Sequence, residues 1–192
     1  GVDKQHIFRR SWLGKYYVYD LKTKQLSLIS EKLIQEPTFS PDGKKVAFSN
    51  KNNLFVKDLE TEEITQITTD GEKNKIINGI TDWVYAEEFH VVKAFAWNGN
   101  SDKIAFLRFD ETEVPEFSMD IYGSSLYPSQ QVFKYPKAGE KNSEISLHIF
   151  DLKKDKSTPI NLGSNPVSSS LKVSSYSSFS SSERSSYLIP SC

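Results

Sequence analysis

The sequence predicts an all-β fold built from four-stranded antiparallel sheets. Two strand–turn–strand repeats that interleave along the chain are the main observation behind this prediction, and segments with helical periodicity are scarce. The composition agrees, because 37% hydrophobic and 26% charged residues are typical of a globular protein with its own core. The elements follow from these repeats in chain order.

The first repeat is a hairpin: an alternating strand, an Asp-Leu turn with charged residues, and a second alternating strand. It occurs at residues 17–29, 54–67 and 147–160. Alternation of apolar and polar residues is the pattern of a strand with one buried face. We therefore expect a β-hairpin at each of the three places.

The second repeat joins these hairpins through a tight turn. In residues 39–48, Pro41 presets the backbone angle φ and Gly43 accepts a positive φ, so the turn has a physical basis. Residues 96–106 repeat the pattern with a degenerate turn. The two repeats together give four strands per unit, and the first two units are spaced by about 40 residues, the period of a propeller blade. The sequence therefore predicts a partial β-propeller of four-stranded antiparallel blades.

An insertion interrupts the repeat between residues 70 and 95. Asn78-Gly79 is a strong turn signal. Thr81 or Asp82 is placed to cap a short helix that runs toward two adjacent glutamates. A second insertion spans residues 110 to about 142. Insertions on a rigid scaffold are where recognition residues concentrate.

The composition changes abruptly at residue 164, because fourteen of the last 29 residues are serine. Such a segment has too few apolar residues to bury a core by itself. We predict one partial propeller domain over residues 1–163 and treat residues 164–192 as a serine-rich tail that is not a domain.

The first insertion resembles the double-glutamate motif of the dipeptidyl peptidase IV family, over residues 78–88. Segments at 8–12, 109–115 and 135–139 are similar to family segments in the same order. The resemblance covers about residues 5–163. It implies an N-terminal propeller that encloses an active site together with a C-terminal α/β-hydrolase domain.

The resemblance also implies roles for individual residues. Glu87 and Glu88 would hold the free α-amine of a peptide, and Arg9, with Arg10 as a competitor, would contact the carbonyl of the second substrate residue. Proline or alanine would precede the cleaved bond. One departure is visible, since Ala86 stands where the family usually has a third acidic residue.

The residue types suit this chemistry independently of the resemblance. A protonated amine has three donors, and two adjacent carboxylates can accept them in charge-assisted hydrogen bonds. Neighbouring carboxylates repel each other when the site is empty, so a bound ammonium is favoured. The alternative without a binding role is that the two adjacent glutamates are part of a solvent-exposed helix face. The hypothesis of a metal site at Asp82, Glu87, Glu88 and His90 has less support, because the spacing of these residues matches no known ligand pattern.

The chain contains no Gly-x-Ser-x-Gly nucleophile elbow. We therefore expect the catalytic triad in a hydrolase domain outside this chain, and the segment to be enzymatic only as part of a full-length serine dipeptidyl peptidase. Two rival hypotheses remain: a tripeptidyl peptidase with acidic anchors farther from the nucleophile, and a non-catalytic propeller that binds proteins.

Partners and setting follow from charge and residue usage. A net charge of −1 gives no reason to expect nucleic acid, and no cofactor is expected. The expected partners are a peptide with a free N-terminus, the hydrolase domain and, by the resemblance, a second copy in a homodimer. The single cysteine, Cys192, and the lack of any Asn-x-Ser/Thr sequon favour a bacterial protein. The compartment stays open, with the periplasm or cell envelope as a hypothesis.

Overall fold

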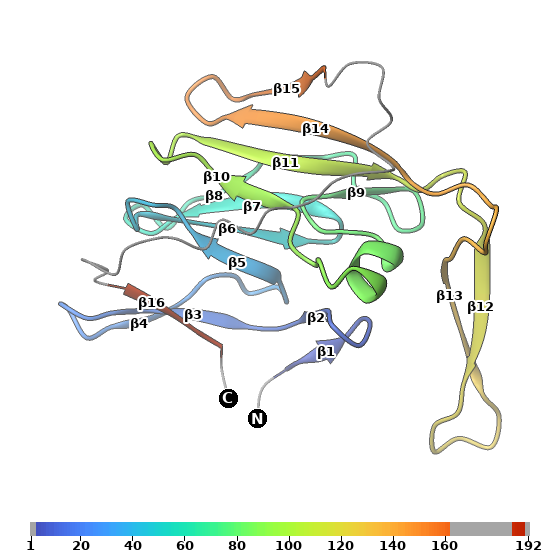
Figure 1. Ribbon diagram of the computed structural model, residues 1–192. Coiled ribbons are helices and arrows are strands. Elements are labelled where there is room, and N and C mark those ends of the chain that lie inside the picture. The colour runs from blue at the N-terminus through green and yellow to red at the C-terminus, as the bar shows by residue number, and fades with distance from the viewer. Residues whose placement is uncertain (1–2, 162–185, 191–192) are drawn as a thin grey trace.

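Antiparallel sheets stacked in sequence order make up almost all of the structure (Figure 1). The structure is a computed structural model that describes residues 3–161 and the strand 186–190. The first sheet has the order β16-β3-β4 and the second the order β5-β6-β7-β8. The third has the order β10-β11-β14-β15, with β9 also paired to β11. The all-β prediction is confirmed for these residues; they form no closed ring of sheets.

The strands of the first two sheets have the following bounds: β3 Tyr16–Asp20, β4 Leu26–Leu28, β5 Gln35–Phe39, β6 Lys45–Asn50, β7 Asn53–Asp58, β8 Ile64–Gln66 and β16 Ser186–Pro190. Those of the third sheet are β9 Ile76–Asn78, β10 Phe95–Trp97, β11 Lys103–Asp110, β14 Glu144–Asp151 and β15 Lys156–Ile160. Two separate hairpins pair β1 (Gln5–His6) with β2 (Trp12–Leu13) and β12 (Glu116–Ile121) with β13 (Ser129–Lys134).

The predicted hairpin repeat is confirmed in its details. Asp20, Asp58 and Asp151 each end a strand, and each accepts two hydrogen bonds from backbone N–H groups two and three residues ahead. The residue four positions after each aspartate has a positive φ, between 49° and 63°. An aspartate side chain can satisfy a turn backbone in this way, which is why the Asp-Leu pattern recurs.

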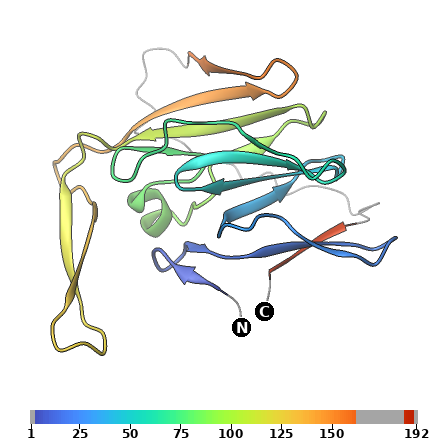
Figure 2. The same ribbon diagram turned by 180° about the vertical axis from the view of Figure 1, so that it is seen from behind.

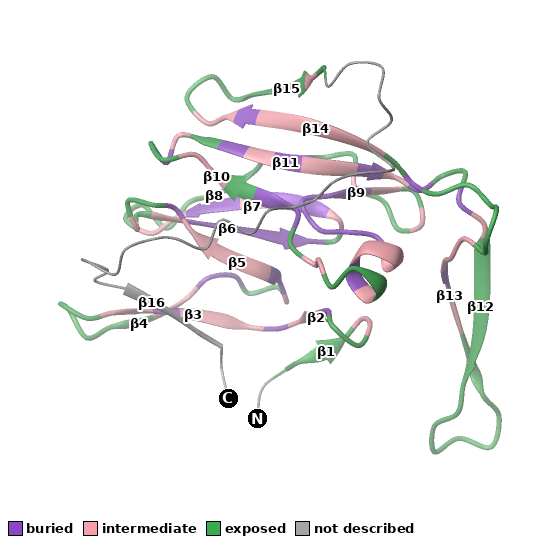
Figure 3. Ribbon diagram, in the orientation of Figure 1, coloured by how far each residue is buried: buried purple, intermediate pink, exposed green. Residues whose placement is uncertain are grey.

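The predicted tight turn between β5 and β6 is also confirmed. Gly43 has a φ of +71°, and Asp42 accepts hydrogen bonds from the Ser40 hydroxyl and the Lys44 N–H. Adjacent sheets bury apolar side chains against each other. Figure 3 marks the buried residues along these strands in purple. The core between the first and second sheets is Val18, Ile29, Ile34, Val46 and Phe48. The core between the second and third sheets is Ala47, Leu54, Val56, Ile67, Phe95, Ile104, Phe106 and Phe150.

Both predicted insertions leave the sheets. The first contains the short π-helix η1, Val84–Glu88, which confirms a helical insertion. The second forms the β12–β13 hairpin, which projects away from the stacked sheets in both views (Figures 1 and 2). The insertions therefore add surface to a regular scaffold.

The strand β16 pairs antiparallel with β3 and comes from the serine-rich segment, for which the sequence suggested no strand. The rest of the predicted tail lies outside the described residues, so the predicted domain limits remain a prediction. Over the part of the chain that the structure describes, no helix has the length and apolar character to cross a membrane.

Candidate functional site

The loop that carries the two glutamates is closed at its base by backbone pairing. Ile80 and Lys93 form an antiparallel bridge, and the N–H of Thr81 donates to the carbonyl of Val92. Gly79 begins this loop with a φ of +73°. A Cβ at position 79 would lie 2.5 Å from the Leu54 side chain, so only glycine fits there. The Asn-Gly signal thus marks the place where the loop leaves β9.

Asp82 holds the first turn of η1 with its side chain, although Trp83, and neither Thr81 nor Asp82, occupies the N-cap position, and Trp83 makes no side-chain cap hydrogen bond. Its Oδ1 accepts the N–H of Tyr85 at 3.0 Å, and its Oδ2 accepts the hydroxyl of Ser143 at 2.6 Å. Burial raises the pKa of Asp82, while the Ser143 and backbone hydrogen bonds oppose that rise. The start of the helix is therefore tied to the residue that precedes β14.

The two predicted amine anchors project from the end of η1. Glu87 is half-buried and Glu88 is exposed. Oε1 of Glu87 accepts the backbone N–H of Arg10 at 3.1 Å. The loop between β1 and β2, which carries Arg9, therefore lies against the helix, although 77 residues separate the bonded pair in sequence. The structure thus brings together the two segments that the sequence singled out.

The charged groups at this place are available to a ligand. Within the described residues, no ion pair engages Glu87, Glu88, Arg9 or Arg10. Both arginines are exposed. Two adjacent carboxylates, with two exposed arginines on the loop that contacts them, can bind a molecule that carries an ammonium at one end and a carbonyl acceptor nearby.

An aromatic cluster supports the helix from behind. The Trp83 ring lies 4.6 Å from that of Tyr135 and 6.2 Å from that of Phe133, and Phe133 lies 5.8 Å from Phe8. This cluster joins the helix entry, the base of the β12–β13 hairpin and the loop that carries Arg9. Trp83 is thus a packing residue, and large rings make such a junction stiff.

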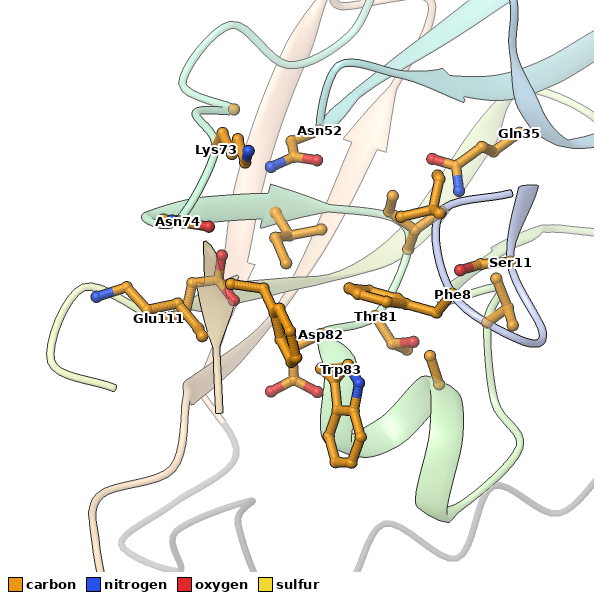
Figure 4. A pocket seen from close by; sticks show the side chains of 18 of the residues that line it. Phe8, Ser11, Gln35, Asn52, Lys73, Asn74, Thr81, Asp82, Trp83 and Glu111 are labelled. Atoms are coloured by element: carbon orange, nitrogen blue, oxygen red, sulfur yellow. The ribbon is translucent and has the colours of Figure 1, made fainter. Parts of the chain in front are cut away.

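A cavity of about 580 Å³ lies next to the start of η1 and was not anticipated from the sequence. Ala86 and Phe8 line it, but neither glutamate nor Arg9 does. Figure 4 shows polar side chains on opposite walls, among them Ser11, Gln35, Asn52, Lys73, Asn74 and Glu111. The Ser11 hydroxyl is buried and has no hydrogen-bond partner among the residues that the structure describes.

Glu111 lines this cavity, and its pKa differs strongly from the ordinary value. It is 6% exposed, and burial together with the nearby charge of Asp82 raises its pKa to about 7. Lys134 opposes the rise. Glu111 belongs to the second insertion. Its closeness to Asp82 could not be predicted from the sequence, because no local pattern indicates it.

The metal alternative receives no support. In the ranges 3–161 and 186–190, no group of three or more His, Cys, Asp or Glu side chains could hold a metal ion. Asp82 points to Ser143 and the helix backbone, whereas Glu87 and Glu88 lie at the other end of the turn.

Comparison with known proteins finds relatives that are named as peptidases. The family described as "Dipeptidyl peptidase IV (DPP IV) N-terminal region" matches residues 1–187. The chain is 37% identical over 152 residues to human "Prolyl endopeptidase FAP", covering 78% of this chain and 20% of that protein. It is 36% identical over 171 residues to "Probable dipeptidyl-aminopeptidase B" of Arthroderma gypseum, covering 81% and 18% respectively.

Solved structures agree. The crystal structure of Porphyromonas gingivalis dipeptidyl peptidase 4 matches with a TM-score of 0.81 and 41% identity, covering 85% of this chain and 24% of that one. A putative dipeptidyl aminopeptidase IV from Bacteroides ovatus matches with a TM-score of 0.56 at 21% identity, which shows likeness of fold alone. The chain spans about a fifth of the length of the curated relatives that it matches.

Proposed function

Because the chain belongs to the dipeptidyl peptidase IV family, whose N-terminal region it matches over residues 1–187, we propose that it recognises the N-terminus of peptides for a serine exopeptidase. Residues 1–163 form part of a β-propeller in this proposal, and the stacked antiparallel sheets support it. The parent enzyme releases X-Pro or X-Ala dipeptides, and its nucleophile comes from a separate hydrolase domain.

The observation that carries the proposal is the meeting of the two anchor segments. The hydrogen bond from the Arg10 N–H to Glu87 sets the loop that bears Arg9 beside the glutamate pair. One site can then contact the α-amine through Glu87 and Glu88 and the following peptide carbonyl through Arg9. This combination fits a peptide end and does not fit an internal peptide segment, which has no ammonium.

The anchors act by positioning the substrate. An enzyme that removes dipeptides must measure distance from the free amine, and the carboxylate pair supplies the reference point. Holding the scissile bond at the nucleophile makes the reaction effectively intramolecular, which can lower the barrier by about 7–11 kcal/mol in the best-oriented systems. The residues of this chain take no part in bond making or breaking in this scheme.

In addition to the hydrolase domain, we propose a second copy of the protein as a partner. The β12–β13 hairpin projects from the scaffold and exposes several apolar side chains: Phe117, Met119, Ile121, Tyr122, Leu126 and Tyr127. Leu126 is 89% exposed. Large exposed apolar patches mark interaction sites, and a projecting hairpin of this kind suits a symmetric contact.

The experiment that tests the function compares hydrolysis of Gly-Pro-chromophore and its N-acetylated form by the full-length parent protein. We expect cleavage of the free-amine substrate and a loss of at least tenfold in kcat/KM on acetylation. Equal cleavage of both substrates would contradict amine recognition. No cleavage of either, by folded protein that also leaves longer peptides intact, would favour a protein-binding scaffold.

A further inference from the structure

The carboxylate of Asp82 connects the glutamate-bearing helix with the third sheet. Oδ1 accepts the Tyr85 N–H inside the first turn of η1, and the N–H of Val84 adds to the same interaction. Oδ2 accepts the hydroxyl of Ser143. Asp82 is 6% exposed and Ser143 is 5% exposed, so water does not compete for these bonds.

The far end of this connection is rigid. Ser143 directly precedes β14, which pairs with β11 over eight residues from Lys103↔Asp151 to Asp110↔Glu144. The near end is a single turn of helix, five residues long, followed by the exposed Phe89 and His90. A helix this short is unstable without partners. Its orientation therefore depends on its contacts with the rest of the molecule: the aromatic cluster around Trp83, the bond between Glu87 and Arg10, and the bonds of the Asp82 carboxylate at the first turn.

From this geometry we infer that Asp82 is a positioning residue that orients Glu87 and Glu88 toward the peptide amine through its bonds to the helix backbone and to Ser143. The inference rests on the proposed function. Asp82 itself makes no contact with substrate in it. Glu87 and Glu88 lie five and six residues beyond Asp82, so a change in the first turn of η1 changes the direction of both carboxylates together.

The chemistry of the site predicts how different substitutions behave. Alanine at position 82 removes both acceptor atoms. Asparagine keeps an oxygen for the Tyr85 N–H and places an amide opposite Ser143, whose hydroxyl can accept as well as donate. If orientation is what matters, Asp82→Asn restores function that Asp82→Ala loses. If the negative charge acts directly on the ammonium, both substitutions do equal harm.

The test measures kcat and KM for Gly-Pro-chromophore with the full-length parent protein and the variants D82A, D82N, S143A and E88A. We expect D82A to raise KM about tenfold, the factor equivalent to losing a capping side chain, with a much smaller change in kcat. D82N should lie near the parent, and S143A, which removes one bond and leaves the bond from the Tyr85 N–H to Asp82, should fall between. S143A also keeps the test decisive if D82A does not fold.

Asp102→Ala is the matched control. Asp102 also accepts two side-chain hydrogen bonds, from Asn98 and Lys153, but it lies in the turn between β10 and β11, at the other end of β11. We expect no change in its KM. A normal KM in folded D82A and S143A, with a raised KM in E88A, would overturn the inference and leave the proposed function standing. A normal KM in E88A as well would overturn both.

Discussion

The backbone N–H of Arg10 donates a hydrogen bond of 3.1 Å to Oε1 of Glu87, and this bond makes the two adjacent glutamates unequal. Glu87 is half-buried and fixes the loop that carries Arg9, whereas Glu88 is exposed and makes no hydrogen bond within the described residues. Glu87 therefore has a structural task besides amine binding, and Glu88 is the freer ligand.

This inequality predicts coupling between Arg9 and Glu87. Replacing Glu87 by alanine frees the loop, so part of the contribution of Arg9 is already lost. We expect the combined loss in kcat/KM for Gly-Pro-chromophore in R9A/E87A to be smaller than the product of the single losses, by about 1 kcal/mol of interaction energy. The cycle R9A/E88A is the matched control and should be additive within about 0.5 kcal/mol. Equal coupling in both cycles would contradict the structural task of Glu87.

Glu111 predicts a pH dependence of stability. Its pKa is raised to about 7 in the folded protein by burial and by the charge of Asp82, against 4.5 ordinarily. The folded state then binds the proton more tightly than the unfolded state does. The resulting stability is fully present below pH 4.5 and is lost as the pH rises through 7. The full effect is up to about 3 kcal/mol.

Thermal unfolding of the full-length protein with Glu111→Gln checks this dependence. The variant keeps a neutral side chain of the same size, so its stability should no longer fall between pH 5 and pH 8. It should therefore exceed the parent in stability at pH 8. Glu113→Gln, a change at an exposed residue of the same loop, is the control and should leave the pH profile intact. An unchanged slope in Glu111→Gln would show that the carboxyl titrates normally.

Alanine substitutions at three glycines distinguish two causes of destabilisation: a strained backbone and a lack of space for the new Cβ. Gly79 has a positive φ and its absent Cβ would meet Leu54, Gly43 has a positive φ with open space, and Gly99 has open space and no positive φ. We expect Gly79→Ala to be the most destabilising, by about 3 kcal/mol or more. Gly43→Ala should cost about 1 kcal/mol and Gly99→Ala close to nothing. Calorimetric midpoints give the order, and a tolerated Gly79→Ala would mean that Leu54 moves freely.

The projecting hairpin predicts the oligomeric state. Replacing Leu126 and Tyr127 together by serine removes two of its most exposed apolar side chains and should convert a dimer into a monomer. Analytical ultracentrifugation of the full-length protein measures this. Leu26→Ser, at an exposed position of β4, is the control and should leave the mass unchanged. A dimer that persists in the double variant would place the contact elsewhere.

The regular part of the fold was predictable because its signals are local. Asp20, Asp58 and Asp151 accept hydrogen bonds from backbone N–H groups of the turn within three residues of themselves. The same sequence pattern therefore recurs wherever the same turn recurs. The turn at Gly43 and the hydrogen bond from the Tyr85 N–H to Asp82 are local in the same sense.

The rest of the site depends on contacts that leave no local pattern. Ser143 lies 61 residues from Asp82 in the sequence, and the residues around Ser143 form no pattern that indicates its hydrogen-bond partner. The raised pKa of Glu111 comes from burial between two insertions, and the pairing of β16 with β3 joins the ends of the chain. The glutamate pair was found through a motif, whereas the residues that orient it required the three-dimensional arrangement.

The most direct test of the central claim is the ratio of kcat/KM for free and N-acetylated Gly-Pro-chromophore, measured for the full-length parent protein and for Glu88→Ala. Amine anchoring predicts a ratio of at least ten in the parent that falls toward one in the variant, because the free-amine substrate loses its partner while the blocked one loses nothing. A ratio that stays the same in Glu88→Ala would contradict the claim and leave the pair as surface charge.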